Sequence, residues 1–268
     1  MEILTQLTPA ETYLIKQESE VSLRDLLKYT FMDLLLKKVL QVNKPTGQEE
    51  VSESNIQVGP NFTNYSPKQH ELAFLEIFQK SPELEVTFKQ LIKTAYQYAR
   101  TKRRFVFKYL FESPNISKSI KKGILKRLFF NVQLTDEGLN LRSKIVKELK
   151  HLEETFPILV NNNPEAGKAV LDKINGNVFL LKNFDFELLK EVERAFKKEK
   201  RERDEEEEDW DDLSYFVFFD SYDTFSDSFD RDYDEADADS GFGGGDSDGG
   251  GDSGCSGCGG CGGCGGCG

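Results

Sequence analysis

The first 254 residues of this 268-residue chain contain no cysteine, and the whole chain has only two histidines. Without cysteine, disulfide bonds cannot stabilise that part, and it cannot carry a Cys/His catalytic pair. His70 and His151 are expected at helix surfaces, and no Ser/His/Asp arrangement can be assembled around them. The Gly-Lys pair of "NPEAGKAV" lacks the upstream glycine and the following Ser or Thr of a phosphate-binding loop. The sequence therefore predicts a protein that is not an enzyme.

Long apolar runs are also missing. Runs such as "LLL" at 34–36 and "YFVFF" at 215–219 are far too short, because a helix needs about 20 apolar residues to span a bilayer. The N-terminal "MEILTQLTPAETYLIK" has neither the positively charged segment nor the apolar stretch of a signal peptide. We therefore expect a cytoplasmic protein without a membrane span.

The formal net charge of −12 is unevenly distributed along the chain. Residues 1–66 carry 6 Lys/Arg against 9 Asp/Glu, residues 67–200 carry 26 against 17, and residues 201–268 carry 3 against 21. A basic middle beside an acidic C-terminal part suggests either a partner for the basic part or a tail that screens it. A solvated basic surface with a solubilising tail is the simpler alternative.

Residues 1–66 have the element order of a winged-helix-like domain. "TPAE" predicts a capping box from Thr8 to Glu11 at the start of a helix, and Ser22 caps a second helical stretch with a bend near Tyr29–Thr30. "VLQVNKP" and "IQVGPNF" alternate like two strands, with the polar loop "TGQEEVSESN" between them. Helices followed by a two-stranded ribbon favour a winged helix.

Residues 67–198 predict a helical domain with winged-helix features. The expected elements are helices over 68–80, 86–111, from "NISKSIKK" onward, from "LTDEG" to about residue 156, over 164–174 and at "DFELLKEVERAF", with strands at "FFNVQL" and "NVFLL". Residues 199–254 lack periodic apolar positions and are expected to be a disordered linker, acidic and aromatic first and glycine-rich later. Residues 255–268 form a Cys-Gly-Gly repeat tail. The predicted fold class is mainly α with short β hairpins (α+β), as tandem winged-helix-like modules followed by that disordered tail.

Three segments together resemble a group of uncharacterised bacterial proteins. They are "LTPAETYLI…LRDLL…LLLKKVLQV", "KRLFFNVQLTDEGLNLRSKI" and the final "GCSGCGGCGGCGG". Proteins of this group, some of them membrane-anchored, carry winged-helix-like modules and end in glycine-cysteine repeats. The resemblance implies an architecture and no catalytic residue, and this chain lacks the transmembrane helices of the membrane-bound members.

A basic segment offers a candidate nucleic-acid-binding surface, because Lys and Arg displace the counterions of phosphates. The aromatic residues Phe105 and Phe107 within it are expected in the core rather than against bases. The acidic-aromatic segment 204–235 could lie along such a surface intramolecularly and compete at high effective concentration, or remain an unattached solubilising tail. The candidate basic residues are Arg100, Lys102, Arg103, Arg104, Lys121, Lys122, Lys126 and Arg127.

The tail holds all five cysteines, three residues apart: Cys255, Cys258, Cys261, Cys264 and Cys267. This spacing repeats CxxC, which lets two thiolates reach one zinc or copper ion, and glycine permits the tight turns required. An extended tail would instead place the thiols about 9 Å apart for cross-linking other chains. Enzymatic closure of the cysteines into thiazole rings, or a repeat with no specific role, are further alternatives.

The sequence as a whole favours a non-enzymatic binding or adaptor protein with an unknown protein partner and a tail able to bind a soft metal ion. The first alternative is a nucleic-acid-binding winged-helix regulator with an acidic self-shielding tail. The second is a substrate or precursor for peptide modification at the Gly-Cys tail.

Overall fold

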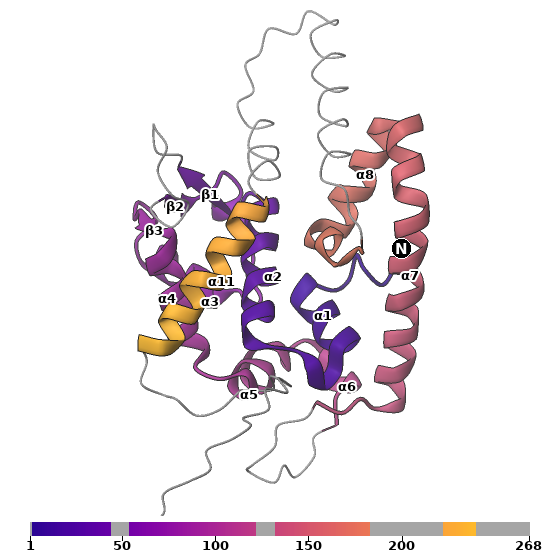
Figure 1. The fold of residues 1–268 in the computed structure, drawn as a ribbon, viewed down its shortest axis with the longest axis horizontal. Helices are drawn as coiled ribbons and strands as arrows, with labels where there is room; N and C mark the ends of the chain where they lie inside the picture. Colours follow the sequence, from indigo (N-terminus) through magenta and orange to yellow (C-terminus); the bar gives the residue numbers. More distant parts are fainter. Residues whose placement is uncertain (1, 44–53, 122–131, 183–221, 240–268) are drawn as a thin grey trace, which may run out of the picture.

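The computed structural model describes residues 2–43, 54–121, 132–182 and 222–239, which are mostly helical and include a small antiparallel sheet (Figure 1). The elements in chain order are α1 (Pro9–Gln17), η1 (Glu18–Glu20), α2 (Leu23–Leu36), β1 (Leu40–Asn43), β2 (Asn55–Val58), η3 (Phe62–Asn64), α3 (Leu72–Lys80), β3 (Val86–Thr87), α4 (Phe88–Ala99), α5 (Lys102–Arg104), η4 (Phe105–Leu110), α6 (Pro114–Ser119), α7 (Asp136–Asn162), α8 (Pro164–Ile174), η5 (Asn175–Leu180) and α11 (Tyr222–Asp239).

The first two helices begin at the predicted caps. The Thr8 hydroxyl accepts from the Glu11 amide and the Glu11 carboxylate accepts from the Thr8 amide, which together form a capping box. The Ser22 hydroxyl accepts from the amide of Asp25. The two helices expected on either side of Tyr29–Thr30 are one continuous helix, in which the Thr30 hydroxyl donates to the Leu26 carbonyl at 2.7 Å.

The two predicted strands form an antiparallel ribbon, and a short third strand extends it. β1 pairs with β2 from Leu40↔Val58 to Asn43↔Asn55, and β2 pairs with β3 through Ile56↔Val86. The third strand has two residues, which is too short for the alternation that predicted the other two. The ribbon is therefore part of a three-stranded sheet in the order β1-β2-β3.

Local interactions interrupt some of the predicted helices or make them begin later in the sequence. α3 begins at Leu72 rather than Lys68, because the Glu71 carboxylate accepts from the Lys68 amide at 2.7 Å and holds residues 68–71 in a turn. The helix expected over 86–111 is interrupted at Arg100, whose φ of 63° is left-handed. It continues as α5 and as the π-helix η4. The strand expected at "NVFLL" is part of the 3-10 helix η5.

The C-terminal half of the helical body follows its caps closely. The Thr135 hydroxyl accepts from the Gly138 amide at the start of α7, which runs on to Asn162 and is longer than expected. Asn163 caps α8 by accepting from the Ala166 amide, and α8 ends before Asn175 as predicted. The first half of the strand expected at "FFNVQL" lies outside the described residues, and the described part makes an isolated bridge between Ile120 and Leu134.

One hydrophobic core joins the two predicted modules 1–66 and 67–198. α2 lies between the sheet with α3 and α4 on one side and α1, α7 and α8 on the other (Figure 1). Phe31 of α2 packs against Phe74 and Phe88, with ring centroids 5.5 and 5.3 Å apart. On the other side, the Asn177 side chain donates to the carbonyls of Leu4 and Leu7, both at 2.8 Å. The core therefore crosses the boundary placed at residue 66.

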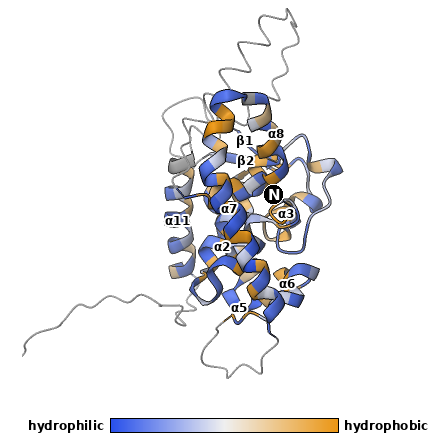
Figure 2. Ribbon diagram, turned by 90° about the vertical axis from the view of Figure 1, so that its right-hand side faces the viewer, coloured by the Kyte–Doolittle hydropathy of each residue, from blue (hydrophilic) through white to orange (hydrophobic). Residues whose placement is uncertain are grey.

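Residues 222–239, inside the range predicted to be a disordered linker, form the helix α11. α11 lies along α2 and α4 at the edge of the molecule, and most of its residues are hydrophilic (Figures 1 and 2). The rest of the predicted linker and the cysteine tail lie outside the described residues. None of the described helices is both long enough and apolar enough to cross a membrane.

Candidate functional site

α11 docks on α2 and α4 through a surface that combines cations with buried aromatic rings. We call the residues of α2 and α4 that pair with α11 the docking face. α2 contributes cations and one buried aromatic ring, and α4 contributes the same combination with a tyrosine in addition. The docking face consists of Arg24, Lys28, Phe31, Phe88, Lys89, Lys93 and Tyr96.

The centre of this contact is aromatic. Phe225, Phe229 and Tyr233 follow one another at four-residue spacing on α11 and are 3%, 0% and 9% exposed. The Phe229 ring lies 6.2 Å from that of Phe31 and 6.3 Å from that of Phe88. Phe88 also meets Phe225 edge-on at 5.7 Å. Such ring pairs contribute about 0.5–1.5 kcal/mol each beyond the area that they bury.

The C-terminal half of α11 continues the aromatic contact with polar atoms added. Tyr233 meets Tyr96 edge-on at 5.2 Å, and the Arg24 guanidinium lies over the Tyr233 ring at 5.4 Å. The Tyr96 hydroxyl donates to the carboxylate of Asp237. The cation over the ring adds an attraction that depends on aromatic chemistry as well as on charge.

Ion pairs flank the aromatic centre on both sides. On the α2 side Lys28 pairs with Asp230 at 2.7 Å, and Arg24 pairs with Asp234. Because the residue numbers fall along α2 as they rise along α11, the two helices run antiparallel. On the α4 side Lys89 pairs with Glu235 at 2.7 Å and Lys93 with Asp239 at 2.8 Å, so α4 and α11 run in the same direction.

The charges of the flanking pairs shift each other's titration. The hydrogen bond to Glu235 raises the pKa of Lys89, and the hydrogen bond from Lys93 lowers the pKa of Asp239. Both shifts favour the charged forms. These pairs are exposed to water, where ion pairs stabilise little, so they select charge and orientation more than they stabilise the contact.

A second polar cluster lies buried where α1 meets the segment before α3. Lys68 donates to the Glu11 carboxylate at 2.7 Å, and the Thr8 hydroxyl lies 3.2 Å from Nε2 of His70. Burial raises the pKa of Glu11, but the charges of His70 and Lys68 outweigh it and leave that pKa below its ordinary value. Burial lowers the pKa of His70 to about 4.

The surface position predicted for His70 is therefore wrong, because its side chain is 2% exposed. The segment from residue 66 to 71 turns inward before α3 begins, so the histidine faces α1 instead of solvent. His151 lies exposed on α7, as predicted. With His70 buried and its pKa lowered to about 4, the cluster joins α1 to the start of α3, and Lys68 is its partly exposed member.

The adjoining ion pairs extend this cluster to α2. Lys37 donates to Asp33 at 2.6 Å, and the Tyr65 hydroxyl donates to Glu71 at 2.8 Å. Burial raises the pKa of Glu71, against the opposing charge of Lys37. Although burial disfavours its charge, Lys37 has a raised pKa because Asp33, Tyr65 and Glu71 surround it. Each buried charge is thus paired, as a structural network requires.

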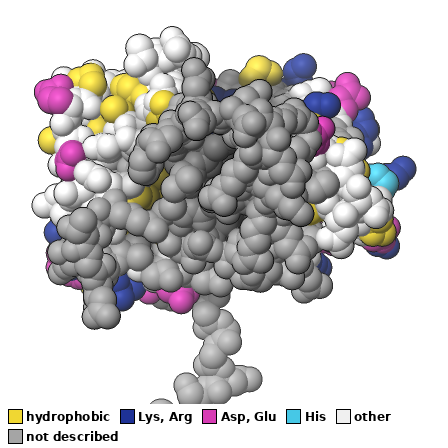
Figure 3. All heavy atoms as spheres, turned by 90° about the horizontal axis from the view of Figure 1, so that it is seen from above, with side chains coloured by type: hydrophobic (Ala, Val, Ile, Leu, Met, Phe, Trp, Pro, Cys, Tyr) yellow, Lys and Arg dark blue, Asp and Glu magenta, His cyan; other side chains and the backbone are white. Residues whose placement is uncertain are grey.

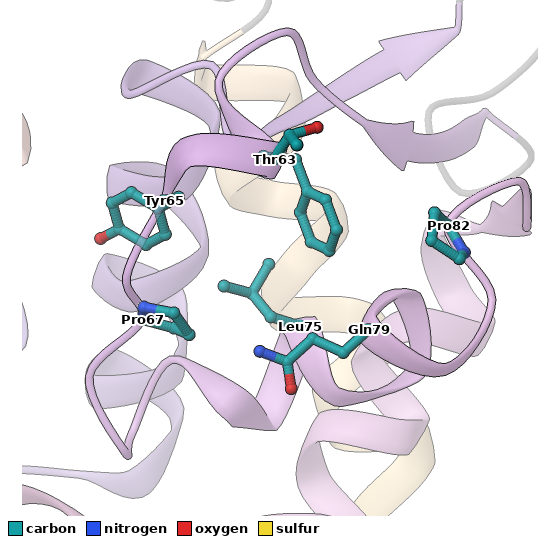
Figure 4. A pocket seen from close by; sticks show the side chains of 7 residues that line it. Thr63, Tyr65, Pro67, Leu75, Gln79 and Pro82 are labelled. Carbon is teal, nitrogen blue, oxygen red and sulfur yellow. The ribbon is translucent and has the colours of Figure 1, made fainter.

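A hollow of about 340 Å³ opens beside these residues (Figure 4). Tyr65, Pro67, Leu75 and Gln79 surround it, and Gln79 brings the single amide group. The Tyr65 hydroxyl is held by Glu71. The lining of the hollow is mainly apolar and includes no carboxylate, amine or imidazole. The hollow could therefore accommodate an apolar group, but its lining lacks the usual acid–base groups. The lining residues are Phe62, Thr63, Tyr65, Pro67, Leu75, Gln79 and Pro82.

The predicted nucleic-acid-binding residues of the described part of the chain differ in exposure. Arg100, Arg103 and Lys121 are exposed, whereas Lys102 is buried. Arg104 is half-buried and donates to the Tyr109 hydroxyl at 3.3 Å. Lys122, Lys126 and Arg127 lie outside the described residues, as do Cys255, Cys258, Cys261, Cys264 and Cys267. Phe105 is buried and Phe107 half-buried, which agrees with the expected core positions.

The surface of the described residues carries both signs of charge. In the view from above, Lys and Arg side chains lie next to Asp and Glu side chains around the edge (Figure 3). Among residues 2–43, 54–121, 132–182 and 222–239, no group of three or more His, Cys, Asp or Glu side chains is arranged to hold a metal ion. The cations of the docking face were missed by the sequence analysis, although the four-residue aromatic spacing of α11 could have revealed their partner.

No protein-family model matches this chain, and comparisons with curated proteins and with solved structures likewise find no match.

Proposed function

We propose that this chain is a non-enzymatic binding protein whose docking face recognises an acidic amphipathic helix. One observation carries the proposal: α11 presents three aromatic rings between two rows of carboxylates, and the docking face provides aromatic rings between two rows of cations. An apolar stripe laid on an apolar face is a recurring mode of helix recognition. An apolar centre with a charged rim is the usual anatomy of a protein interface.

The adaptor function predicted from the sequence fits this surface. The proposal includes a winged-helix-like description of residues 1–66, supported by the succession of α2 and the β1–β2 ribbon. It also includes a cysteine tail that binds a soft metal ion, supported by the CxxC spacing alone. A nucleic-acid-binding role with acidic self-shielding is less well supported, because α11 covers Lys89 and Lys93 rather than the predicted cluster at 100–104.

A full-length protein with a released α11 tests the proposal. Phe225→Ser with Phe229→Ser removes the two rings from the α11 stripe and preserves every charge. A fluorescent peptide of residues 222–239 should then bind this variant with a Kd on the order of 10–100 µM, measured by anisotropy, because a few rings and exposed ion pairs supply modest free energy.

Charge reversal distinguishes the docking face from unspecific attraction. Adding Lys89→Glu and Lys93→Glu to the released variant should weaken peptide binding at least about tenfold, since two attractive pairs become repulsive. Lys147→Glu with Lys150→Glu, on the exposed side of α7, is the matched control and should change the affinity little. Absence of peptide binding to the released variant, or equal losses from both reversals, would refute the proposed recognition surface.

A further inference from the structure

The sequence of α11 is poorly suited to be a helix by itself. Its 18 residues include eight acidic residues and one basic residue, and the last turn has no cation. Aspartate is a weak helix former, and carboxylates near a helix C-terminus oppose the helix dipole. The unfavourable charges at that end include Glu235 and Asp239, which the docking face neutralises with Lys89 and Lys93. α11 therefore depends on its contact with α2 and α4 to remain helical.

The contact itself is of moderate strength. The apolar side chains that α11 buries are Phe225, Phe229, Tyr233 and Ala236. The flanking pairs on the α4 side add specificity but little free energy, because both partners of Lys89–Glu235 and of Lys93–Asp239 are about half exposed, whereas Lys28–Asp230 on the α2 side is more buried. Elements with few buried apolar contacts and water-exposed polar ones are those that open most readily in folded proteins. α11 has the properties of an element that detaches while the core stays folded.

We propose that α11 is an exchangeable internal ligand, and that the docking face binds in its place an acidic amphipathic helix supplied by a partner protein. This inference rests on the proposed function. The partner helix is defined by charge complementarity to the docking face, because α11 shows that a helix with aromatic rings and carboxylates fits there. Since α11 needs the docking face to remain helical, it can leave the face by unfolding. A segment of this kind folds as it binds, which permits exchange at modest free-energy cost.

The geometry of α11 defines the partner helix. Aromatic residues at positions i, i+4 and i+8 would take the places of Phe225, Phe229 and Tyr233. Carboxylates at i+5 and i+9 would face Lys28 and Arg24, and those at i+10 and i+14 would face Lys89 and Lys93. The partner helix would run antiparallel to α2. A basic helix would place like charges together on both sides and be rejected.

Tethering gives α11 the advantage over a partner at low concentration. The segment between Lys182 and Tyr222 has 39 residues, and a tethered ligand acts at an effective concentration on the order of 1 mM. With an intrinsic Kd of about 10–100 µM, α11 would occupy its own face in roughly 90–99% of molecules. The apparent affinity for a partner helix should therefore be about 10- to 100-fold weaker in the wild type than in a protein with α11 released.

Competition between the two helices provides the test. The 222–239 peptide is titrated into the wild-type full chain and into the Phe225→Ser/Phe229→Ser variant under identical conditions. The variant should bind at least about tenfold more tightly. Saturating peptide should also increase hydrogen exchange in α11 of the wild-type chain. Isotopic labelling of the added peptide distinguishes it by mass from α11. A peptide with all eight carboxylates replaced by amides should bind neither protein well, because it lacks the flanking charges.

The outcomes separate this inference from the proposed function. Peptide binding to the variant but not to the wild type, with α11 of the wild type still protected at saturating peptide, would overturn the exchange and leave the docking face as a recognition surface. No binding to the variant would instead refute the recognition surface itself. A wild-type dimer in sedimentation that the two Phe→Ser changes abolish would assign the face to α11 of a second copy, and the partner-protein inference would fall. Asp227→Asn with Ala238→Ser, on the exposed side of α11, is the matched control and should behave as wild type.

Discussion

His70 shows how one buried residue sets the acid sensitivity of the fold. Its folded-state pKa of about 4 lies below the ordinary histidine value of about 6.5, so the unfolded chain binds a proton that the folded chain rejects between these values. Stability should therefore be complete above about pH 6.5 and fall as the pH drops towards 4. At pH 5 the loss from this group is roughly 2 kcal/mol. Urea unfolding at pH 7 and pH 5 measures it.

Substitution separates His70 from the carboxylates of the cluster. His70→Gln preserves a hydrogen-bonding group for Thr8 and should flatten the stability change between pH 7 and pH 5, whatever its effect at pH 7. His151→Gln, at an exposed position of α7, should leave the wild-type slope unchanged. A steep loss that persists in His70→Gln would contradict the assignment, because it would place the proton uptake on another group.

Gly176 is required by close packing between η5 and the first two helices. A Cβ atom at this position would lie 2.6 Å from Oδ1 of Asp33 and 2.7 Å from Cγ of Pro9. The Gly176 amide also donates to Oδ1 of Asp33 at 2.9 Å. Gly176→Ala should lower the free energy of unfolding by about 2 kcal/mol through overpacking. In urea titrations, Lys173→Ala at an exposed site of α8 should cost far less, and equal costs would argue against the steric explanation.

Side-chain caps are the features that the sequence predicts best. The Thr8–Glu11 box, the Ser22 cap and the Asn163 cap all involve residues three apart, so local sequence contains the whole interaction. The buried His70 instead contacts Thr8, which is 62 positions away in the sequence. The hydrogen bond from the Lys68 amide to the Glu71 carboxylate forms a turn where the helix was predicted to start. No local sequence pattern distinguishes this turn from a helix start.

At the scale of elements, α11 is the main departure from the sequence prediction. Its apolar residues are few, and its acidic composition is typical of disordered segments. The four-residue spacing of Phe225, Phe229 and Tyr233 is consistent with a helix, but the formation of that helix depends on cations of α2 and α4. Intramolecular docking of the acidic-aromatic segment is one of the alternatives predicted from the sequence, but on the basic cluster near Arg104. The order of α11 is therefore a tertiary effect, which composition cannot reveal.

Hydrogen exchange should show that α11 is the least stable of the buried helices. In the wild type, amides near Phe229 should be protected, but less than those near Phe31 in the continuous helix α2, because fewer apolar contacts hold α11. Raising the salt concentration from 0.05 to 0.5 M should reduce α11 protection by screening the flanking pairs, with α2 unchanged. Protection of α11 equal to that of α2, independent of salt, would show that it is an integral part of the core.

At the scale of the whole molecule, one hydrophobic core contains residues from both predicted modules. Helical periodicity predicts which face of each helix is buried, but it does not predict which helix faces pack against each other. Phe31 packs against Phe74 and Phe88, and β2 pairs with β3, so contacts cross the predicted boundary repeatedly. The winged-helix expectation was made from the order of elements before the boundary, and the third strand comes from after it. Element order alone therefore could not separate one domain from two.

A shared core predicts cooperative unfolding of the body. Calorimetry should give one main transition, with a calorimetric enthalpy close to the van't Hoff enthalpy, because α2 packs against elements from both predicted modules. The released variant Phe225→Ser/Phe229→Ser should show the same single transition at a lower temperature, since α11 covers Phe31 and Phe88. Two separate transitions of comparable enthalpy would instead support independent modules joined by a weak interface.

The cysteine tail contributes a prediction that the folded body does not influence. Four thiolates can complete a tetrahedral zinc site, and the five cysteines at 255–267 supply one more than is needed. Cys258→Ser with Cys261→Ser leaves three thiols and should abolish Cys₄ binding, whereas Cys255→Ser leaves four and should have little effect. Binding should weaken below the ordinary thiol pKa of about 8.5, because metal competes with protons. Anaerobic titration of the reduced protein with Zn²⁺ measures both, and equal losses in the two variants would eliminate the tetrahedral site.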